Sequence, residues 1–486
     1  MSGLKKLIIS SSLLIADAIG QKLVGLISTV ILARILLPED FGIIAIALIF
    51  LGLTQVLSNT GSLQYLLRVD KINKDIVNTA WTISFYTKVA IAILFVALSY
   101  PIAYFYDDTR LILLIVALMG IFVIQALRNP AEVYLKRNQN YNRIVALNIV
   151  SKILAVILSV LVAVIYKSYW ALVAGQFVNA FIGTIGSYII QPHTLRLTLT
   201  DSKAQWLFSK WMIPQSLFGY LRTQLDTIIV SAFFGRAELG SFHTMKYLAY
   251  LPSANFLIPA MQPLLVELSH FKNNKIEFSK RFNTSFLIPF IISIPITSIL
   301  VIYHDLITFL ILGPQWVEFS PILGYFALLI PANVIFQTCS RTLIIYAHSR
   351  FLFIAEIVMF TLIYGGLLLI NLQAIEDFTL LRALLENLFC LTLIIVVSLA
   401  LNTRESTLSL IVILLVTLCA TLPAYQVTLY INFSYESKFI LLLLNSTLFV
   451  MVYFATIFIC YYLLKEKLSD LKYTSELIKK IIRRGK

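Results

Sequence analysis

The stretch DAIGQKLVGLISTVILARILLPEDFG, residues 17–42, sets the architecture that the sequence predicts. Its first part has the length and composition of a membrane-spanning helix and carries Lys22 deep inside it. Its end, LARILLPEDFG (Leu32–Gly42), indicates a tight polar turn that sends the chain back into the membrane. A weaker version of the pattern returns at TIIVSAFFGRAELG (Thr227–Gly240). We therefore expect two halves, each beginning with a charged spanning helix and a turn.

The composition identifies an all-α integral membrane protein. Of 486 residues, 59% are hydrophobic and 13% are charged, and the mean hydropathy is +0.88, whereas a soluble domain is about 25% charged. A helix needs about 20 apolar residues to cross the hydrocarbon core. About fourteen stretches satisfy that length, at 11–36, 40–66, 79–105, 111–135, 144–166, 168–191, 210–235, 240–268, 284–312, 320–347, 350–373, 380–401, 406–432 and 438–464. The first is too long and too polar for a cleaved signal peptide, so we expect it to be retained.

The net charge of +14 reports membrane topology. With the N-terminus inside, the even-numbered turns and both tails collect most Lys and Arg, including Lys136 and Arg137. The opposite face carries Arg34, Arg110, Lys167, Arg236, Arg382 and Lys438, mixed with acids. By the positive-inside rule both termini are cytoplasmic and the number of spans is even. The basic residues then contact anionic lipid, and no nucleic-acid partner is expected.

The spans divide into two sets of six and a final pair. We expect an N-terminal lobe (1–191), a cytoplasmic connecting loop (192–209), a C-terminal lobe (210–401), two further spans (402–464) and a cytoplasmic tail (465–486). At an offset of 198 residues, Asp40 pairs with Glu238 and Gly42 with Gly240 (240 − 42 = 198). Both sets start inside, which predicts a parallel repeat with the substrate path between the lobes.

The last pair of spans and the tail allow two interpretations each. Spans 13 and 14 have apolar interiors, and either pack as lipid-facing helices or form a groove for an acyl chain. The tail alternates basic and apolar residues at helical spacing, which favours an interfacial amphipathic anchor over a partner-binding helix.

Cations inside the spans are the candidate substrate-binding residues. An ionisable side chain at the bilayer centre costs about 2.5–3.5 kcal/mol on insertion scales, so it usually faces a cavity or a partner. Six of them form the predicted cationic cavity: Lys22, Arg222, Lys88, Arg128, Lys152 and Arg341. Lys246 lies nearer the outer face. The alternative is that each cation snorkels to the interface or pairs inside its lobe.

Asp226 follows Arg222 by one helical turn on the same face. It is either the partner of a structural ion pair or a coupling site for a proton or cation. No residues are expected to be catalytic: the chain has no Gly-rich phosphate loop and no HExxH motif. The five histidines and four cysteines have no ligand spacing, so no metal is expected.

Several stretches resemble the Wzx-type polysaccharide flippases of the MOP exporter superfamily. The most specific is LARILLPEDFG (Leu32–Gly42). SNTGSLQYLLR (Ser58–Arg68), NPAEVYLKRNQNYNRI (Asn129–Ile144) and FLILGPQW (Phe309–Trp316) are also similar to segments of that family. The chain departs at Asn59, where the family usually has Asp, and at 138–142, where the family is more basic.

The resemblance implies two pseudo-symmetric six-helix bundles in a V with two additional C-terminal helices. It implies alternating access that moves an undecaprenyl-diphosphate-linked oligosaccharide from the cytoplasmic to the periplasmic leaflet of a bacterial inner membrane. Such a protein serves the synthesis of O-antigen, capsule or exopolysaccharide, beside a polysaccharide polymerase and chain-length machinery. It needs no cofactor and is driven by a proton gradient, a sodium gradient or the membrane potential.

Two other functions are alternatives to a flippase. A cation-coupled small-molecule exporter of the same superfamily typically has acidic sites, whereas cations outnumber acids inside these spans. A membrane-embedded oligosaccharide polymerase would need a large outer loop to hold catalytic residues, and no predicted outer loop has that size.

Overall fold

The structure is a computed structural model, and it forms two compact units, Met1–His243 and Thr244–Lys486. Every element in the described part of the chain is helical. The described residues are 3–69, 72–200, 202–261, 268, 271, 273–346, 348–369, 374–401, 404–431 and 437–464. The predicted tail (465–486) lies outside the described residues.

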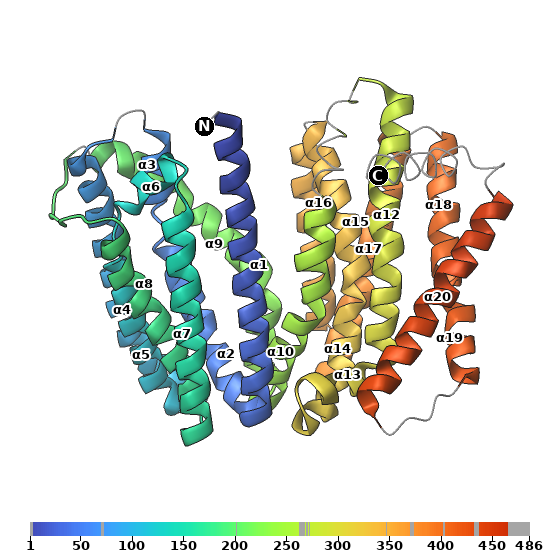
Figure 1. Cartoon of the computed structure of the whole chain (residues 1–486), viewed down its shortest axis with the longest axis horizontal. Helices are drawn as coiled ribbons and strands as arrows, with labels where there is room; N and C mark the ends of the chain where they lie inside the picture. Colours follow the sequence, from blue (N-terminus) through green and yellow to red (C-terminus); the bar gives the residue numbers. More distant parts are fainter. Residues whose placement is uncertain are drawn as a thin grey trace. The chain divides into compact units, whose positions relative to one another are not determined.

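Unit 1 holds the first nine helices and the start of the tenth (Figure 1). They are α1 (Gly3–Ile35), α2 (Pro38–Leu57), α3 (Ser62–Arg68), α4 (Lys74–Phe105), α5 (Arg110–Ala126), α6 (Glu132–Arg137), α7 (Asn142–Tyr166), α8 (Trp170–Ile190), α9 (Ser202–Phe233) and α10 (Arg236–Pro252).

Unit 2 continues from α10 through a turn of π-helix, η1 (Ser253–Leu257). Its other described elements are α12 (Lys275–Ile302), α13 (His304–Ile311), η2 (Pro314–Phe319), α14 (Ser320–Ala327), α15 (Leu329–Ile345), α16 (Ser349–Leu369), α17 (Ile375–Leu401), α18 (Arg404–Cys419), α19 (Thr421–Tyr430) and α20 (Lys438–Leu464).

Eleven helical segments of the described residues are long and apolar enough to cross a membrane. This confirms a multi-pass membrane protein. The predicted span 111–135 corresponds to α5, a shorter apolar helix of 17 residues. The predicted spans 210–235 and 240–268 fall on α9 and α10, which polar residues such as Asp226 make less apolar than the other long helices. The count of fourteen spans stays a prediction.

The turn in the opening stretch lies between Ile35, where α1 ends, and Pro38, where α2 begins. Proline fits the first turn of a helix because its missing N–H would have no partner there. The Asp40 carboxylate accepts a hydrogen bond from the Leu37 N–H at 3.1 Å and another from the Tyr169 N–H at 3.2 Å. The polar residues of this stretch therefore cap α2 and attach it to the start of α8.

The two glycines paired by the sequence repeat contact the partner turn. A Cβ added to Gly42 would lie 1.9 Å from the Arg236 carbonyl oxygen, and one added to Gly240 would lie 1.9 Å from the Pro38 carbonyl oxygen. Only residues without a side chain permit this approach of α2 and α10 within unit 1.

A cluster of charges surrounds this contact. The Arg236 Nε lies 3.0 Å from the Asp108 Oδ2, and the Arg110 Nη2 lies 2.9 Å from the same oxygen. Both guanidinium groups also approach the Glu39 Oε1, Arg110 at 3.6 Å and Arg236 at 3.7 Å. Desolvation would raise the pKa of Asp108, but hydrogen bonds from Arg110 and the charge of Arg236 outweigh it and hold the pKa below its ordinary value.

Two helices of unit 1 are broken where the sequence predicted continuous spans. The predicted span 40–66 is divided between α2 and α3, and the Asn59 side chain accepts a hydrogen bond from the Gly61 N–H at 3.2 Å. Gly61 adopts the left-handed conformation, with φ 61°. The predicted span 111–135 ends early in the same way, because Asn129 accepts from the Ala131 N–H at 2.9 Å. Asparagine side chains commonly form such turns.

Unit 2 is built on a buried aromatic row along α12. Phe278, Phe282, Phe286 and Phe290 recur at helical spacing and are each at most 2% exposed. The Asn283 amide donates to the Ser406 carbonyl at 2.8 Å, and the Tyr453 hydroxyl donates to the Ile291 carbonyl at 3.1 Å. These bonds attach α18 and α20, the predicted spans 13 and 14, to α12.

Candidate functional site

A polar cavity of about 620 Å³ lies inside unit 1. It is enclosed by the broken pairs α2–α3 and α5–α6 together with α4 and α7. Figure 1 shows that α3 and α6 lie at the same end of unit 1 as the N-terminus. Uncharged polar side chains line much of it: Gln55, Ser58, Asn59, Thr60, Ser62, Gln64, Ser84, Gln125, Asn129 and Asn148.

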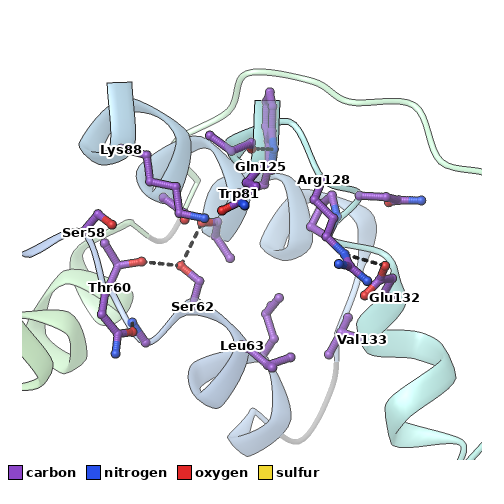
Figure 2. Close-up of a pocket in the computed structure, with 18 of the residues that line it drawn as sticks. Ser58, Thr60, Ser62, Leu63, Trp81, Lys88, Gln125, Arg128, Glu132 and Val133 are labelled. Carbon is purple, nitrogen blue, oxygen red and sulfur yellow. Dashed lines mark hydrogen bonds and ion pairs between the residues drawn. The ribbon is translucent and has the colours of Figure 1, made fainter. Parts of the chain in front are cut away.

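Three cations and one carboxylate also line this cavity: Lys88, Arg128, Lys136 and Glu132. The Lys88 Nζ lies 5.8 Å from the centroid of the Phe122 ring, a distance suited to a cation–π contact. The Arg128 Nε lies 2.9 Å from the Glu132 Oε1. Figure 2 shows Lys88 and Arg128 at the cavity, with Trp81 and Gln125 seen between them.

The charges in this cavity affect one another. Lys136, on α6, has a pKa below the ordinary lysine value, chiefly because burial disfavours the ammonium ion. Glu132 acts to raise that pKa and Arg128 to lower it. Three basic groups against one acid leave the cavity with an excess of positive charge.

The cavity walls are held by hydrogen bonds from buried polar groups. The Trp81 indole N–H donates to the Ala126 carbonyl at 3.1 Å, which joins α4 to the end of α5. The Asn129 amide donates to the Ser187 carbonyl at 3.1 Å, which joins the α5–α6 break to α8. The Arg137 guanidinium donates to the Val69 carbonyl at 2.6 Å, which joins α6 to the end of α3. Each break is thus fixed to a neighbouring helix.

The structure brings together two of the six predicted cavity cations, Lys88 and Arg128. Lys22 is exposed on α1 and is not among the residues that line this cavity. Lys152 is half-buried on α7, one turn beyond the cavity residue Asn148. Arg341 is exposed on α15 of unit 2. The roles predicted for Lys22, Lys152 and Arg341 stay predictions.

Arg222 and Asp226 both lie on α9. The Arg222 side chain is outside the described part of the structure, so its depth and its pairing with Asp226 stay predictions. Asp226 is 1% exposed, and its Oδ1 accepts from the N–H of Thr227 at 2.7 Å. Its predicted role in ion pairing or coupling is therefore untested.

From the sequence, Lys136 was expected only to report membrane topology, and the uncharged polar residues that line the cavity were not predicted. Lys136 follows the predicted span 111–135 directly, and hydropathy alone does not show that the chain folds back there. The signal that could have found the site is the pair of helix-breaking sequences, Asn59–Gly61 and Asn129–Pro130. Both contain an asparagine followed within two residues by a helix-breaking glycine or proline.

The donor set suits an anionic, hydroxyl-rich ligand. A guanidinium donates two parallel hydrogen bonds to phosphate, and an ammonium adds a compact charge. The surrounding amides and hydroxyls donate and accept, as sugar hydroxyls require.

The chain is similar to known proteins in sequence and in fold. The model of a family described as polysaccharide biosynthesis proteins matches residues 31–321. The succinoglycan biosynthesis transport protein ExoT of Rhizobium meliloti (strain 1021) is 21% identical over 300 residues, which cover 61% of this chain and 61% of ExoT. The lipopolysaccharide biosynthesis protein WzxC of Escherichia coli (strain K12) is 20% identical over 308 residues, 62% of each chain. The match thus spans about three-fifths of these relatives.

Two solved structures share the fold. Lipid II flippase MurJ, in an inward closed conformation, has a TM-score of 0.72 at 14% identity, covering 94% of this chain and 99% of that chain. An inward-facing MATE family multidrug resistance transporter of the MOP superfamily has a TM-score of 0.58 at 10% identity, covering 78% and 94%. These likenesses establish the kind of fold.

Proposed function

This chain belongs to the polysaccharide biosynthesis protein family, and we propose that it is a flippase for a polyprenyl-diphosphate-linked oligosaccharide. It moves this lipid from the cytoplasmic to the outer leaflet of a bacterial inner membrane. The observation that carries the proposal is the convergence of Lys88, Arg128 and Lys136 on one polar cavity.

The diphosphate is the part of such a lipid that resists transfer. An ionised group without a partner is very costly in hydrocarbon, and fixed cations replace part of its hydration. The amides and hydroxyls of the cavity meet the first sugars, while the polyprenyl chain stays in the lipid. Lys88 and Arg128 therefore bind the diphosphate in this proposal.

The position of the cavity favours loading from the cytoplasm. It lies towards the end of unit 1 that holds α3, α6 and the N-terminus, and the sequence predicts that this end is cytoplasmic. Alternating access then requires a second state in which the cavity opens outward and holds the diphosphate less tightly. The names of two similar proteins, a succinoglycan transport protein and a lipid II flippase, support transport of a lipid-linked sugar.

The excess of cations in the cavity argues against the alternative function, a cation-coupled small-molecule exporter of the same superfamily. A cationic drug would be repelled by Lys88, Arg128 and Lys136, and Glu132 is already paired with Arg128. An oligosaccharide polymerase differs in its consequence for the cell: its loss leaves unpolymerised units that have already crossed the membrane.

The test is complementation of a flippase-deficient strain, with lipid-linked oligosaccharide measured in each leaflet. We expect the wild-type chain to restore surface polysaccharide, and the empty strain to accumulate the intermediate on the cytoplasmic side. Lys88→Gln and Arg128→Gln should each reduce flipping at least about ten-fold, since a hydrogen bond to a charged group contributes about 1.5–3 kcal/mol. Lys22→Ala and Arg222→Ala test two further predicted binding residues, and each should impair surface polysaccharide while leaving the protein in the membrane.

The matched control is Lys74→Gln, which removes an exposed lysine from the same helix as Lys88 but outside the cavity. It should flip normally. Full flipping by Lys88→Gln and Arg128→Gln together, at wild-type protein levels, would refute the cavity assignment. In a strain that lacks the gene for this chain, accumulation of the lipid-linked oligosaccharide in the outer leaflet would refute the flippase proposal.

A further inference from the structure

A second cavity in unit 1 is apolar, in contrast to the cationic one. It has a volume of about 790 Å³, shares no lining residue with the first cavity, and is lined almost wholly by apolar side chains. Its walls come from α5, α7 and α8. It is therefore a separate cleft within unit 1, although α5 and α7 contribute residues to both cavities.

Side-chain hydrogen bonds attach α8 to both of its neighbours at the cleft, α7 and α5. The Ser159 hydroxyl of α7 donates to the Ala171 carbonyl of α8 at 2.7 Å. The Thr184 hydroxyl of α8 donates to the Ile124 carbonyl of α5 at 3.1 Å. Gly120 of α5 lines the cleft, and a Cβ added there would meet no atom within 4 Å.

The cleft is open on one side. Ile121 and Val173 line it and are 3% and 5% exposed, whereas the lining residues Leu158 and Phe177 are 36% and 43% exposed. The helices α7 and α8 are both among the candidate membrane spans. An open apolar cleft at that depth faces hydrocarbon, so the component available to fill it is a lipid chain.

One end of the cleft has the features of a membrane interface. Tyr166, Ser168 and Trp170 line it where α7 ends and α8 begins, and such aromatic residues favour the headgroup level. Lys167 stands between them, exposed, with φ 46° and ψ 49°. That left-handed conformation suits glycine or asparagine at a helix end and strains other residues. This turn places the exposed Lys167 ammonium group next in sequence to two residues that line the cleft, Tyr166 and Ser168.

We propose that this cleft binds one acyl chain of an anionic phospholipid, whose phosphate lies beside Lys167. The transported substrate is a different molecule. Lys167 and Asn142 are at opposite ends of α7, 25 residues long, which corresponds to about 37 Å. A lipid with its diphosphate among Lys88, Arg128 and Lys136 cannot also place that group at Lys167. The bound phospholipid stabilises the packing of α5, α7 and α8 behind the cationic cavity.

The test uses Trp170 as a reporter in the reconstituted full-length protein. Phospholipids with brominated acyl chains quench nearby tryptophan, and the Trp170 signal is the difference from Trp170→Phe. In vesicles of unbrominated phosphatidylcholine, brominated phosphatidylglycerol should quench Trp170 at about five-fold lower mole fraction than brominated phosphatidylcholine, the preference expected for one lysine near a phosphate.

The variants separate charge, backbone strain and space. Lys167→Gln should abolish the preference for phosphatidylglycerol, and Lys167→Arg should keep it. Lys167→Gly should relieve the strained turn and still abolish the preference for phosphatidylglycerol. If Lys167 acted only through the shape of the turn, this variant would keep the preference. Gly120→Phe should fill the cleft and lower quenching by both lipids. Its matched control is Gly365→Phe, at a glycine of unit 2 that also has open space.

Three results would overturn the proposal. Equal quenching by the two lipids in the wild-type protein would exclude a site for an anionic lipid. Unchanged quenching in Gly120→Phe would show that no chain occupies the cleft. Displacement of brominated phosphatidylglycerol by an equimolar short polyprenyl diphosphate would assign the cleft to the transported class of lipid.

Discussion

If the cationic cavity binds a diphosphate as proposed, Glu132 should limit how tightly it does so. It is 8% exposed in its side chain and keeps Arg128 at 2.9 Å, so an incoming phosphate competes with it for the guanidinium. We expect Glu132→Gln to bind a soluble diphosphate probe about two- to five-fold more tightly, the range for loss of one competing ion pair. The same variant should flip more slowly, because release becomes harder.

The measurement is titration of purified wild-type and variant protein with farnesyl diphosphate, beside a transport assay. Glu277→Gln removes a carboxylate from another i,i+4 pair, with Arg281 of unit 2, and serves as the control. Weaker probe binding by Glu132→Gln would show that this carboxylate positions Arg128 for the ligand and does not compete with it.

Lys136 should make anion binding sensitive to alkaline pH. Burial lowers its pKa from the ordinary value of 10.5, so the ammonium ion loses its proton at a lower pH than an exposed lysine does. Binding of the diphosphate probe should therefore weaken as the pH rises through that lowered pKa. Lys136→Arg should remain charged and keep its affinity over the same range. A wild-type affinity that stays constant up to pH 10.5 would contradict this prediction.

The lowered pKa of Lys136 affects folding stability in the opposite direction to anion binding: stability rises with pH where binding falls. A lysine with a lowered pKa favours the folded state above its ordinary pKa, and that contribution is lost as the pH falls through the lowered value. Lys136 therefore opposes folding slightly at neutral pH, when it is charged and partly desolvated. A bound diphosphate would offset this cost.

Individual residues differed in how far the sequence could place them. A cation inside an apolar helix is expected to face a cavity or a partner, and Lys88 lines the polar cavity beside the Phe122 ring. Its role in binding substrate stays a prediction. Lys22 satisfied the same rule and is exposed on α1 outside this cavity. The sequence gives depth along a helix, but the facing direction depends on which helices pack beside it.

At the scale of elements, the contact between the starts of α2 and α10 depends on two glycines. Alanine at Gly42 or Gly240 would place a Cβ 1.9 Å from a backbone carbonyl oxygen, so the helices must move apart. Overpacking of this kind costs about 1–3 kcal/mol. We expect each variant to unfold at a lower temperature in detergent than the wild-type protein does. The ion pairs of Arg236 with Asp108 and Glu39 should weaken as well, because they lie at the same contact.

Gly20→Ala is the control for this experiment. Gly20 lies within α1, and a Cβ there meets nothing within 4 Å. Alanine should stabilise that helix by about 0.5–1 kcal/mol through its better helix propensity. A Gly42→Ala protein as stable as Gly20→Ala would show that α2 and α10 are not in contact at this point.

The helix breaks were not predicted, and the reason is physical. Spans were assigned from hydropathy averaged over about 20 residues, and the short segments around Asn59–Gly61 and Asn129–Pro130 change that average little. Yet the hydrogen bonds of these asparagines to Gly61 and Ala131 end α2 and redirect the chain after α5. The cavity exists because of these breaks, so its lining could not be obtained from the spans alone.

At the scale of the whole molecule, composition determines the class of protein. Few charges and long apolar runs predicted a helical membrane protein, and the candidate spans and similar proteins confirm it. The roles of Arg222 and Arg341 depend on how distant parts of the chain approach one another. No local pattern contains that information.

Cysteine labelling tests the predicted topology. With both termini cytoplasmic, the loop before α5 lies outside and the connection before α9 lies inside. Thr109 and Thr194 are exposed in these two segments. In a chain carrying Cys419→Ser and Cys460→Ser, we expect Thr109→Cys to react with a membrane-impermeant maleimide in intact spheroplasts. Thr194→Cys should react only after the membrane is permeabilised, and that second reaction is the control for its accessibility. The reverse pattern would place the cationic cavity on the outer side, and cytoplasmic loading of the diphosphate would then be wrong.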